Sequence, residues 1–251
     1  MLAALLELAP TGVEQVDGDG WVEFALYGAP GELPEFPFGP ATLAGVDVGV
    51  SGTEVADDWA ARWREFHRPV LVGERVWVRP PWTRPRAGAL DLVIDPARAF
   101  GTGAHPTTRL SLELLLDVEP RGPLTDIGCG SGVLAIAAAQ LGFEPVFALD
   151  NDPAAIDATL ANGRRNGIEL ARVEQLDLRR DALPPAPTVT ANLVRPLLVE
   201  LARRMPESPE TLIVSGLLEG EEDEAAAAFE QMREHRRLRL LGWSALLLTR
   251  T

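Results

Sequence analysis

A glycine-rich segment at residues 125–132, Thr-Asp-Ile-Gly-Cys-Gly-Ser-Gly, has the residue types of a nucleotide site. Glycines let the backbone turn tightly and approach a ligand, and the alanine-rich stretch that follows predicts a helix with free N–H groups at its start. The next expected strand, residues 145–149, ends in Asp150, 22 positions after Gly128. An acid about 20 positions on is typical of a ribose ligand. The pattern predicts a nucleotide site at Gly128, Gly130 and Asp150; for the glycines alone, a turn that only packs helix on strand is the alternative.

The charge beside this loop indicates which ligand it binds. Asp126 lies directly ahead of the turn, where a carboxylate would repel a phosphate but would suit a cationic amino-acid group. The run D-x-G-x-G-x-G, followed by an acid at the end of the second strand, resembles class I S-adenosylmethionine-dependent methyltransferases. We therefore expect S-adenosylmethionine as the cofactor, with Asp126 in its site, and rank a nicotinamide oxidoreductase far below.

Asn192 ends the expected strand at residues 189–191, and ligands in this kind of fold lie outside the carboxyl ends of the strands. Its amide oxygen can accept an N–H bond and orient an amine, so Asn192 is the predicted catalytic residue. Enzymes that methylate planar base or amide nitrogens carry Asn/Asp-Pro-Pro-aromatic at this position. Here Asn192 is followed by Leu193-Val194-Arg195, which disfavours an adenine or glutamine acceptor.

A second loop precedes the glycine motif and contains Phe100-Gly101-Thr102-Gly103. Pro106 suits the first turn of a helix that runs to about Asp117. Thr107 and Thr108 at its start could bind the carboxylate of the cofactor or merely cap the helix, and the residues alone favour neither. His105 could accept a proton, although a loop-packing role is the simpler interpretation.

The elements around these loops predict an α/β fold with a doubly wound, seven-stranded, mostly parallel sheet. Expected strands are 123–127, 145–149, 170–176, 189–191 and 211–215, followed by an antiparallel hairpin of 236–241 and 243–249. Expected helices are 133–142, 154–165, 196–205 and 219–234. The acidic run 219–224 is interpreted as the solvated first turn of the last helix.

The front of the chain predicts a small α+β domain. Its expected elements are a helix at 2–9, strands at 13–16, 21–26 and 46–50, and an irregular connector at 30–40. A helix at 57–67 and strands at 70–72, 75–78 and 89–94 follow. We expect a substrate-recognition domain at 1–55, a bridging segment at 56–95 and the methyltransferase domain at 96–251.

Composition limits the possible classes of protein. The 251 residues are 46% hydrophobic, enough for a core, and contain a single cysteine, Cys129, which we interpret as a packing residue in a reducing compartment. No stretch has the length of a membrane span, so we expect a cytoplasmic protein. The net charge of −14 disfavours direct nucleic-acid binding and suits a basic protein partner. No cluster has the spacing of a metal site.

Taken together, these stretches resemble the ribosomal-protein methyltransferases of the PrmA type, which modify protein eleven of the large subunit. The resemblance runs over residues 56–250 and rests on Asp58-Trp59 with Trp63, Phe100 to Gly103 with His105 and Thr107-Thr108, Asp126 to Gly132, Asp150 to Pro153, Asn162 with Asn166-Gly167, Ala191 to Leu193, and Ser215-Gly216. It implies that Thr108 (or Thr107), Gly128, Asp150 and Asn192 contact the cofactor, and that the loop with Phe100 and Gly101 belongs to the same site.

The resemblance further implies a monomer that methylates amino groups of a large-subunit ribosomal protein, on a lysine side chain, the N-terminal α-amine or both. The first 55 residues depart from the family, because they are short and proline-rich where relatives carry a fuller recognition domain. Two alternatives therefore stay open: a methyltransferase for another protein or a small amine, and a non-catalytic module that binds S-adenosylmethionine.

Overall fold

The computed structural model describes residues 14–18, 21–25, 39–43, 45–52, 67–96, 103–205 and 207–251. The chain separates into two compact units, residues 1–66 and 67–251. The divisions expected at residues 55 and 95 stay predictions. No helix among the described residues is long and apolar enough to cross a membrane.

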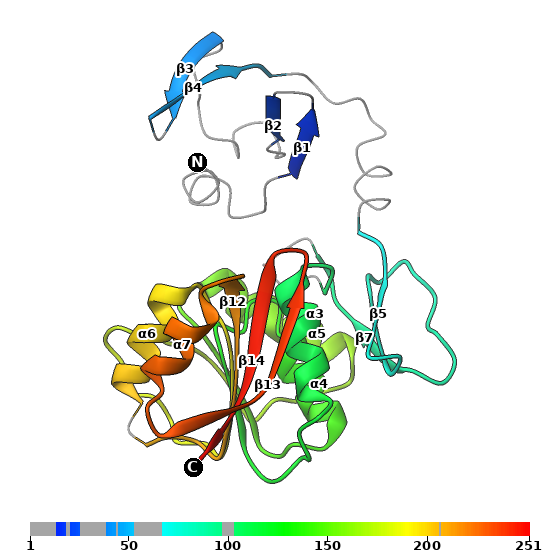
Figure 1. Ribbon diagram of the computed structural model, residues 1–251. Helices are drawn as coiled ribbons and strands as arrows, with labels where there is room; N and C mark the ends of the chain where they lie inside the picture. The colour runs from blue at the N-terminus through cyan, green and yellow to red at the C-terminus, as the bar shows by residue number, and fades with distance from the viewer. Residues whose placement is uncertain are drawn as a thin grey trace. The chain divides into compact units, whose positions relative to one another are not determined.

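The larger unit is built on one seven-stranded sheet, which confirms the predicted α/β fold (Figure 1). Its strands are β8 (Leu124–Ile127), β9 (Val146–Asp150), β10 (Arg172–Gln175), β11 (Thr188–Asn192), β12 (Thr211–Leu218), β13 (Met232–Leu240) and β14 (Trp243–Arg250). They lie in the order β10-β9-β8-β11-β12-β14-β13. Neighbours pair in parallel except at β14, which is antiparallel to both β12 and β13. The order reverses between β8 and β11, which is where such sheets bind ligands.

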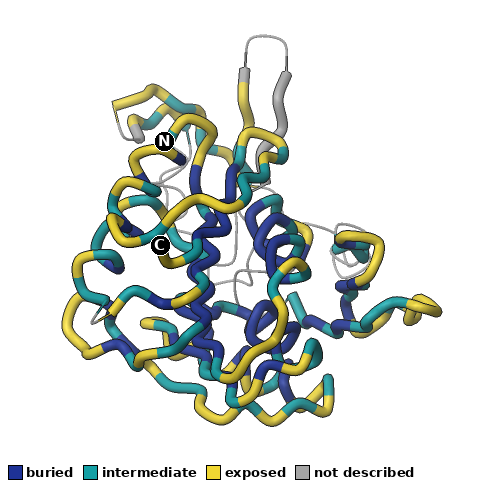
Figure 2. Tube along the Cα trace, turned by 60° about the horizontal axis from the view of Figure 1, so that its bottom comes forward, coloured by how far each residue is buried: buried dark blue, intermediate teal, exposed yellow. Residues whose placement is uncertain are grey.

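Helices cover both faces of this sheet (Figure 1). One face carries α3 (Pro106–Leu115), α4 (Val133–Leu141) and α5 (Pro153–Arg165), and the other carries α6 (Arg195–Arg204) and α7 (Glu222–Ala228). Two clusters of buried apolar side chains fill the two interfaces. All four residues of β8 are buried because this central strand is covered on both sides. In Figure 2 the buried stretches of the chain gather in the interior, and exposed stretches lie outside them.

The helix ends follow the local sequence signals. The Asp152 side chain accepts a hydrogen bond from the Ala154 N–H and caps α5, while Pro153 occupies the first turn. The helix ends at Asn166 and Gly167, as predicted. Gly142, in the left-handed conformation at φ 106°, ends α4.

A small sheet of β5 (Val70–Val72), β6 (Val76–Arg79) and β7 (Leu90–Val93) belongs to the same unit. β5 and β6 pair antiparallel, whereas β6 and β7 pair in parallel. All three strands were predicted from the sequence. The Arg79 guanidinium contacts the Asp91 carboxylate across this sheet at 2.7 and 2.8 Å.

The smaller unit contains two antiparallel hairpins, β1 (Glu14–Gly18) with β2 (Trp21–Ala25) and β3 (Gly39–Leu43) with β4 (Val46–Val50). Three of these strands match expectation. β3 begins within the connector that we expected to be irregular up to residue 40. The predicted helix at 2–9 lies outside the described residues, as does nearly all of the one predicted at 57–67.

One helix prediction was wrong. The helix expected at 219–234 is reduced to α7, which ends at Ala228, and residues 232–240 form β13 instead. The strand pairs with the next strand, β14, from Met232 to Leu240, so the hydrogen bonds of this hairpin outweigh local helix propensity.

The acidic run at 219–224 was also misinterpreted in part. Glu222 is buried, not solvated: its carboxylate accepts hydrogen bonds from Arg239 Nε at 2.6 Å and Ser244 Oγ at 2.8 Å. Desolvation disfavours its ionised form, but these bonds and those from backbone N–H groups outweigh it and lower its pKa to about 2. Glu222 thereby fixes α7 to the β13–β14 hairpin.

Candidate cofactor and acceptor site

The glycine loop between β8 and α4 lies at the point where the strand order reverses. Gly128, Gly130 and Gly132 all have positive φ, at 75°, 53° and 80°. A Cβ on Gly128 would lie 2.4 Å from Leu193 Cδ2, so a side chain there would displace the end of Leu193 as well as strain the left-handed backbone. The sequence motif therefore forms the tight turn that a nucleotide site requires.

Asp150 lies at the end of β9, beside this loop. One carboxylate oxygen accepts a hydrogen bond from the Gly130 N–H at 2.9 Å, and the other accepts one from the Asp152 N–H at 3.0 Å. Each oxygen keeps a further lone pair, because a carboxylate has about four acceptor positions. The carboxylate is held in place and can still bind hydroxyl groups.

Asp126 is fully buried in β8. Its Oδ1 accepts a hydrogen bond from Thr190 Oγ1 at 2.7 Å, whereas Oδ2 makes none of normal geometry with any described residue. Desolvation raises the pKa of Asp126 to about 7, although hydrogen bonding by Thr190 and by the backbone of Ala135 favours the ionised form. A buried oxygen without a partner is costly unless a ligand supplies one.

The start of α3 shows how the two threonines differ. His105 is the N-cap: its Nδ1 lies 3.3 Å from the Thr107 backbone nitrogen, which donates to it, and 2.7 Å from Thr107 Oγ1. Capping by a threonine, one of the two interpretations that we left open, is therefore not what is found. Thr108 is buried, and its Oγ1 has no partner in the described part of the chain.

His105 does more than pack in a loop. Its ring meets that of Trp243 edge-on, with centroids 5.0 Å apart, so the start of α3 lies against the start of β14. Burial lowers the pKa of His105, which keeps the imidazole neutral and its Nδ1 able to accept.

Asn192 ends β11 and is followed by a closely packed backbone segment. The Leu193 N–H donates to the Ser215 carbonyl at 3.0 Å. Gly216 has φ 87°, and a Cβ there would lie 2.3 Å from the Leu193 carbonyl oxygen. β12 therefore fixes the direction in which the chain leaves β11 after Asn192.

Asn162 on α5 connects the glycine loop to the small sheet. Its Nδ2 donates to the Ser131 carbonyl at 2.9 Å, and its Oδ1 accepts from the Asp95 N–H at 3.0 Å. The side chain is fully buried between the two. It links the glycine loop to the segment that leads toward residues 97–102.

The structure brings most of the predicted site residues to one edge of the sheet, on β8, β9, β11 and the loops and helix beside them. The predicted residues Phe100 and Gly101 lie outside the described part of the chain.

Cys129 is buried, with its Sγ 3.3 Å from Thr159 Oγ1, and burial raises the pKa of the thiol. This agrees with a packing role. The described residues contain no group of three His, Cys, Asp or Glu side chains that could hold a metal ion.

Two residues of this region were not predicted to act in it. Thr190 pairs with Asp126 in register across β11 and β8, and the only signal in the sequence is a threonine two places before Asn192 in a buried strand. Asn162 was noted only as part of the resemblance. Its spacing from Asn166 puts both amides on one face of α5.

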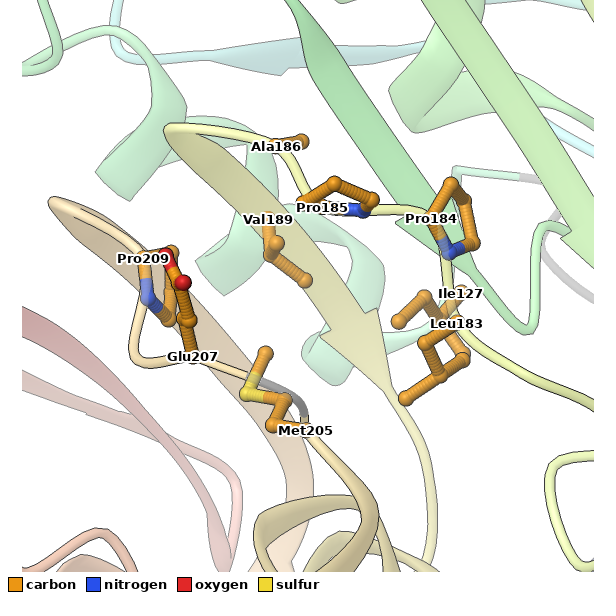
Figure 3. A pocket seen from close by; sticks show the side chains of 9 residues that line it. All are labelled: Ile127, Leu183, Pro184, Pro185, Ala186, Val189, Met205, Glu207 and Pro209. Atoms are coloured by element: carbon orange, nitrogen blue, oxygen red, sulfur yellow. The ribbon is translucent and has the colours of Figure 1, made fainter.

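A small pocket lies apart from the predicted cofactor-binding residues, so the presence of a pocket does not by itself identify the cofactor site. It is lined mainly by apolar side chains, among them Leu183, Pro184, Met205 and Pro209, and has room for about one water molecule (Figure 3). None of the predicted site residues lines it. We assign it no role in cofactor binding.

Comparison with known proteins identifies the family. The family model described as Ribosomal protein L11 methyltransferase (PrmA) matches residues 42–251. A ribosomal protein L11 methyltransferase of Marinobacter nauticus is 40% identical over 195 residues, covering 75% of this chain and 64% of that protein. One of Burkholderia multivorans is 35% identical over 286 aligned positions, covering 98% of this chain and 92% of that protein.

A solved structure supports the fold. The ribosomal protein L11 methylase of Lactobacillus delbrueckii subsp. bulgaricus superimposes with a TM-score of 0.66 at 24% identity, over 73% of this chain and 99% of that one. Several curated relatives are longer than the matched region: the chain spans 61% of the Azotobacter vinelandii relative, for example. From the extent of the family match and the identity to these relatives, the chain belongs to the ribosomal protein L11 methyltransferase (PrmA) family.

Proposed function

We propose that this protein is an S-adenosylmethionine-dependent methyltransferase that modifies amino groups of a large-subunit ribosomal protein, on a lysine side chain, the N-terminal α-amine or both. The observation that carries the proposal is that three adjacent parallel strands end at one edge of the sheet in the glycine loop (β8), Asp150 (β9) and Asn192 (β11). Family membership supplies the acceptor class.

The proposal extends to the setting of the reaction. We expect a cytoplasmic monomer with a basic protein as partner, acting without direct contact to nucleic acid or membrane, in line with the net charge of −14. Residues 1–55 would recognise the acceptor, 56–95 would bridge, and 96–251 would hold the cofactor and carry out the transfer.

The residues present fit S-adenosylmethionine. Asp150 has acceptor capacity for a ribose hydroxyl pair. Asp126 Oδ2 has no hydrogen-bond partner among the described residues and suits a cationic amino group. The Thr108 hydroxyl, likewise without a partner in that part of the chain, can donate to a carboxylate, with Thr107 as the alternative. Gly128 and Gly130, and the loop of Phe100 and Gly101, would complete the site. When bound, this cofactor supplies a methyl group on a positively charged sulfur.

Asn192 would position the acceptor. Its amide oxygen, with a backbone carbonyl near Leu193, would accept the N–H groups of the amine and direct its lone pair toward the methyl carbon. The neutral amine held by Asn192 would accept the methyl group that the bound cofactor supplies, and the proton of the product ammonium would leave to water. Positioning and exclusion of water would provide most of the acceleration.

The acceptor must be neutral to react. An α-amine with a pKa of roughly 7.7–8.0 is partly neutral at pH 7, whereas a lysine near about 10.4 must first lose a proton. The rate should therefore rise with pH over the range set by the amine that is used.

The test is calorimetric binding of S-adenosylmethionine, followed by transfer of labelled methyl to purified ribosomal protein L11. Binding with transfer would support the proposal, and Asn192→Ala should then reduce transfer while cofactor binding persists. Binding without transfer to L11, but with label on another extract protein, would reject the acceptor alone. Binding without any transfer would favour a module that only binds the cofactor.

A further inference from the structure

Three large aliphatic side chains are exposed on segments that leave the same edge of the sheet as Asn192, although nothing in the fold requires them to be apolar. Val194, Leu218 and Leu241 are 58%, 50% and 77% exposed. Val194 follows the end of β11, Leu218 ends β12, and Leu241 lies in the turn between β13 and β14. By the strand directions all three lie beyond the carboxyl edge of the sheet, where the acceptor must arrive.

Hydrogen bonds join these positions into one surface. Arg195, next to Val194, contacts Glu221 through Nε at 3.2 Å. The other oxygen of Glu221 accepts from the Leu218 N–H at 2.9 Å. The Glu219 N–H donates to the Gly242 carbonyl at 3.0 Å, which fixes the hairpin turn next to the end of β12. The three aliphatic side chains therefore belong to adjoining segments that are held together.

Leu241 is unfavourable both for the turn and for solubility. It has φ 50° and Gly242 has φ 78°, the pair of positive φ angles of a type I′ hairpin turn, whose first position favours asparagine. A leucine there is strained and exposes most of its side chain to water. Together with exposed Val194 and Leu218, a strained and exposed apolar residue at the edge where the acceptor must arrive is a candidate contact for a partner.

The charge around the surface defines the partner. Acidic residues occupy five of the six positions from Glu219 to Glu224. Three arginines (Arg195, Arg237 and Arg239) pair with members of this run, so two negative charges remain in excess. The arginine nearest to Val194, Arg195, is already engaged by Glu221 and Glu224. Glu219 and Glu224 are exposed at the rim. The surface is thus apolar in its middle and acidic at its edge, which complements a segment that carries an apolar residue among basic ones.

We propose that Val194, Leu218 and Leu241 form a docking surface that holds a basic segment of the acceptor protein, through an apolar side chain of that segment, beside Asn192. The proposal rests on the methyltransferase function given above. It adds that part of the acceptor specificity lies on the catalytic unit itself, on the β13–β14 turn and the end of β12.

The experiment compares Leu241→Asn, Leu218→Gln and their combination with the unchanged protein in methyl transfer to purified L11. Leu241→Asn introduces the residue that this turn favours, so the thermal midpoint should be equal or higher. Loss of the apolar contacts should raise the KM for L11 by about tenfold or more in the double variant. The kcat at saturating L11 and the calorimetric affinity for S-adenosylmethionine should stay the same.

Leu160→Gln is the matched control, because Leu160 is 40% exposed on α5, next to the strands at the other end of the sheet. It should leave the KM unchanged. Two results would reject the docking surface while the proposed function stands, provided that the unchanged protein methylates L11. In one, the double variant has the same KM for L11 as the unchanged protein. In the other, the KM rises but the double variant also binds S-adenosylmethionine more weakly. If the unchanged protein transfers no methyl, the proposed function fails, and the docking surface fails with it.

Discussion

Gly216 lies against the carbonyl of Leu193, so closely that a Cβ on Gly216 would be 2.3 Å from the carbonyl oxygen and 2.7 Å from the carbonyl carbon. Real Cβ atoms do not approach backbone this closely. The bulge in β12 between Ser215 and Leu217 thus brings the Gly216 backbone against the segment that follows Asn192. Because Gly216 has no side chain, β12 can pack against Leu193 and so keep the Asn192 amide in its position at the end of β11.

Gly216→Ala should reduce catalysis more than it affects the cofactor. The added methyl group must push Leu193 and Asn192 away, and a displacement of about 1 Å near the reacting atoms can reduce the rate by about 100-fold. We expect kcat with L11 to fall at least tenfold, while the calorimetric affinity for S-adenosylmethionine changes little.

Gly167→Ala is the control for backbone strain. Gly167 has φ 65° but has nothing within 4 Å of an added Cβ. Both substitutions should destabilise the fold by about 1 kcal/mol through the left-handed conformation. An equal loss of kcat in the two variants would show that strain, and not the approach to Leu193, is responsible.

The pKa of Asp126 gives a prediction about cofactor binding and pH. With a pKa of about 7, the buried carboxylate is largely protonated at pH 6 and ionised at pH 8. If Oδ2, which has no partner among the described residues, binds a cationic amino group, affinity should rise with pH through 7, by about fourfold between pH 6 and pH 8, because the α-amine of the cofactor is itself partly neutral at pH 8. Calorimetric titrations with S-adenosylmethionine at both pH values measure this.

Asp126→Asn supplies the comparison, because the amide keeps the shape and an acceptor for Thr190 but cannot ionise. The variant should bind weakly at both pH values, with much less change between them. A variant that retains the full pH dependence would assign the titration to another group and remove Asp126 from the amino-group site.

The sequence was sufficient for the parts of this fold that depend on neighbouring residues. β8, β9 and β11 were predicted to within two residues, because each is a short segment that follows a proline and is closed by a glycine or a polar residue. Asp152 before Pro153 correctly marked the start of α5. The segment at 229–234 was predicted wrongly because its strand character comes from pairing with β14, which local propensity does not contain.

In the site, too, the features set by neighbouring residues were predictable and those set by long-range pairing were not. The positions of Gly128, Asp150 and Asn192 at strand ends follow from the chain order. Asp126 is buried and bonded to Thr190, 64 positions away, only because β8 and β11 are neighbours in the sheet. That pairing could not be predicted from the sequence. The contact of Gly216 with Leu193 could not be predicted from the sequence either, because a glycine at this position could equally have formed a turn.

The amide pair on α5 allows the link between the small sheet and the glycine loop to be tested. Asn162→Ala removes two buried hydrogen bonds, one to the Ser131 carbonyl and one from the Asp95 N–H. It should lower the free energy of unfolding by about 2 kcal/mol or more, measured in urea. The loosened glycine loop should also weaken S-adenosylmethionine binding by about tenfold.

Asn166→Ala separates these two effects. Its side chain bonds the Val93 N–H and the carbonyls of Val93 and Asn162, so its loss is comparably destabilising, but it does not contact the glycine loop. Cofactor affinity should change little. If both variants weaken binding equally, Asn162 acts through general stability and not by positioning the loop.

The cap of α3 predicts a loss of stability in mild acid. His105 Nδ1 can accept from the Thr107 N–H only while it is unprotonated, and burial lowers the pKa of His105 below its usual 6.5. As pH falls through about 6.5, the unfolded chain takes up a proton that the folded chain refuses, so the free energy of unfolding decreases until the lowered pKa is reached. The loss lies below pH 6.5, and it is absent above that value.

His105→Asn keeps a favourable capping residue and removes the titration, so its unfolding free energy should fall less than that of the unchanged protein between about pH 7.5 and pH 5.5. Asp126, whose raised pKa makes stability increase as pH falls over the same window, is present in both proteins and cancels in the comparison. His235→Asn, at an exposed position on β13, should behave like the unchanged protein. If unfolding in urea shows the same pH dependence for the unchanged protein and His105→Asn, the neutral histidine cap does not contribute to stability.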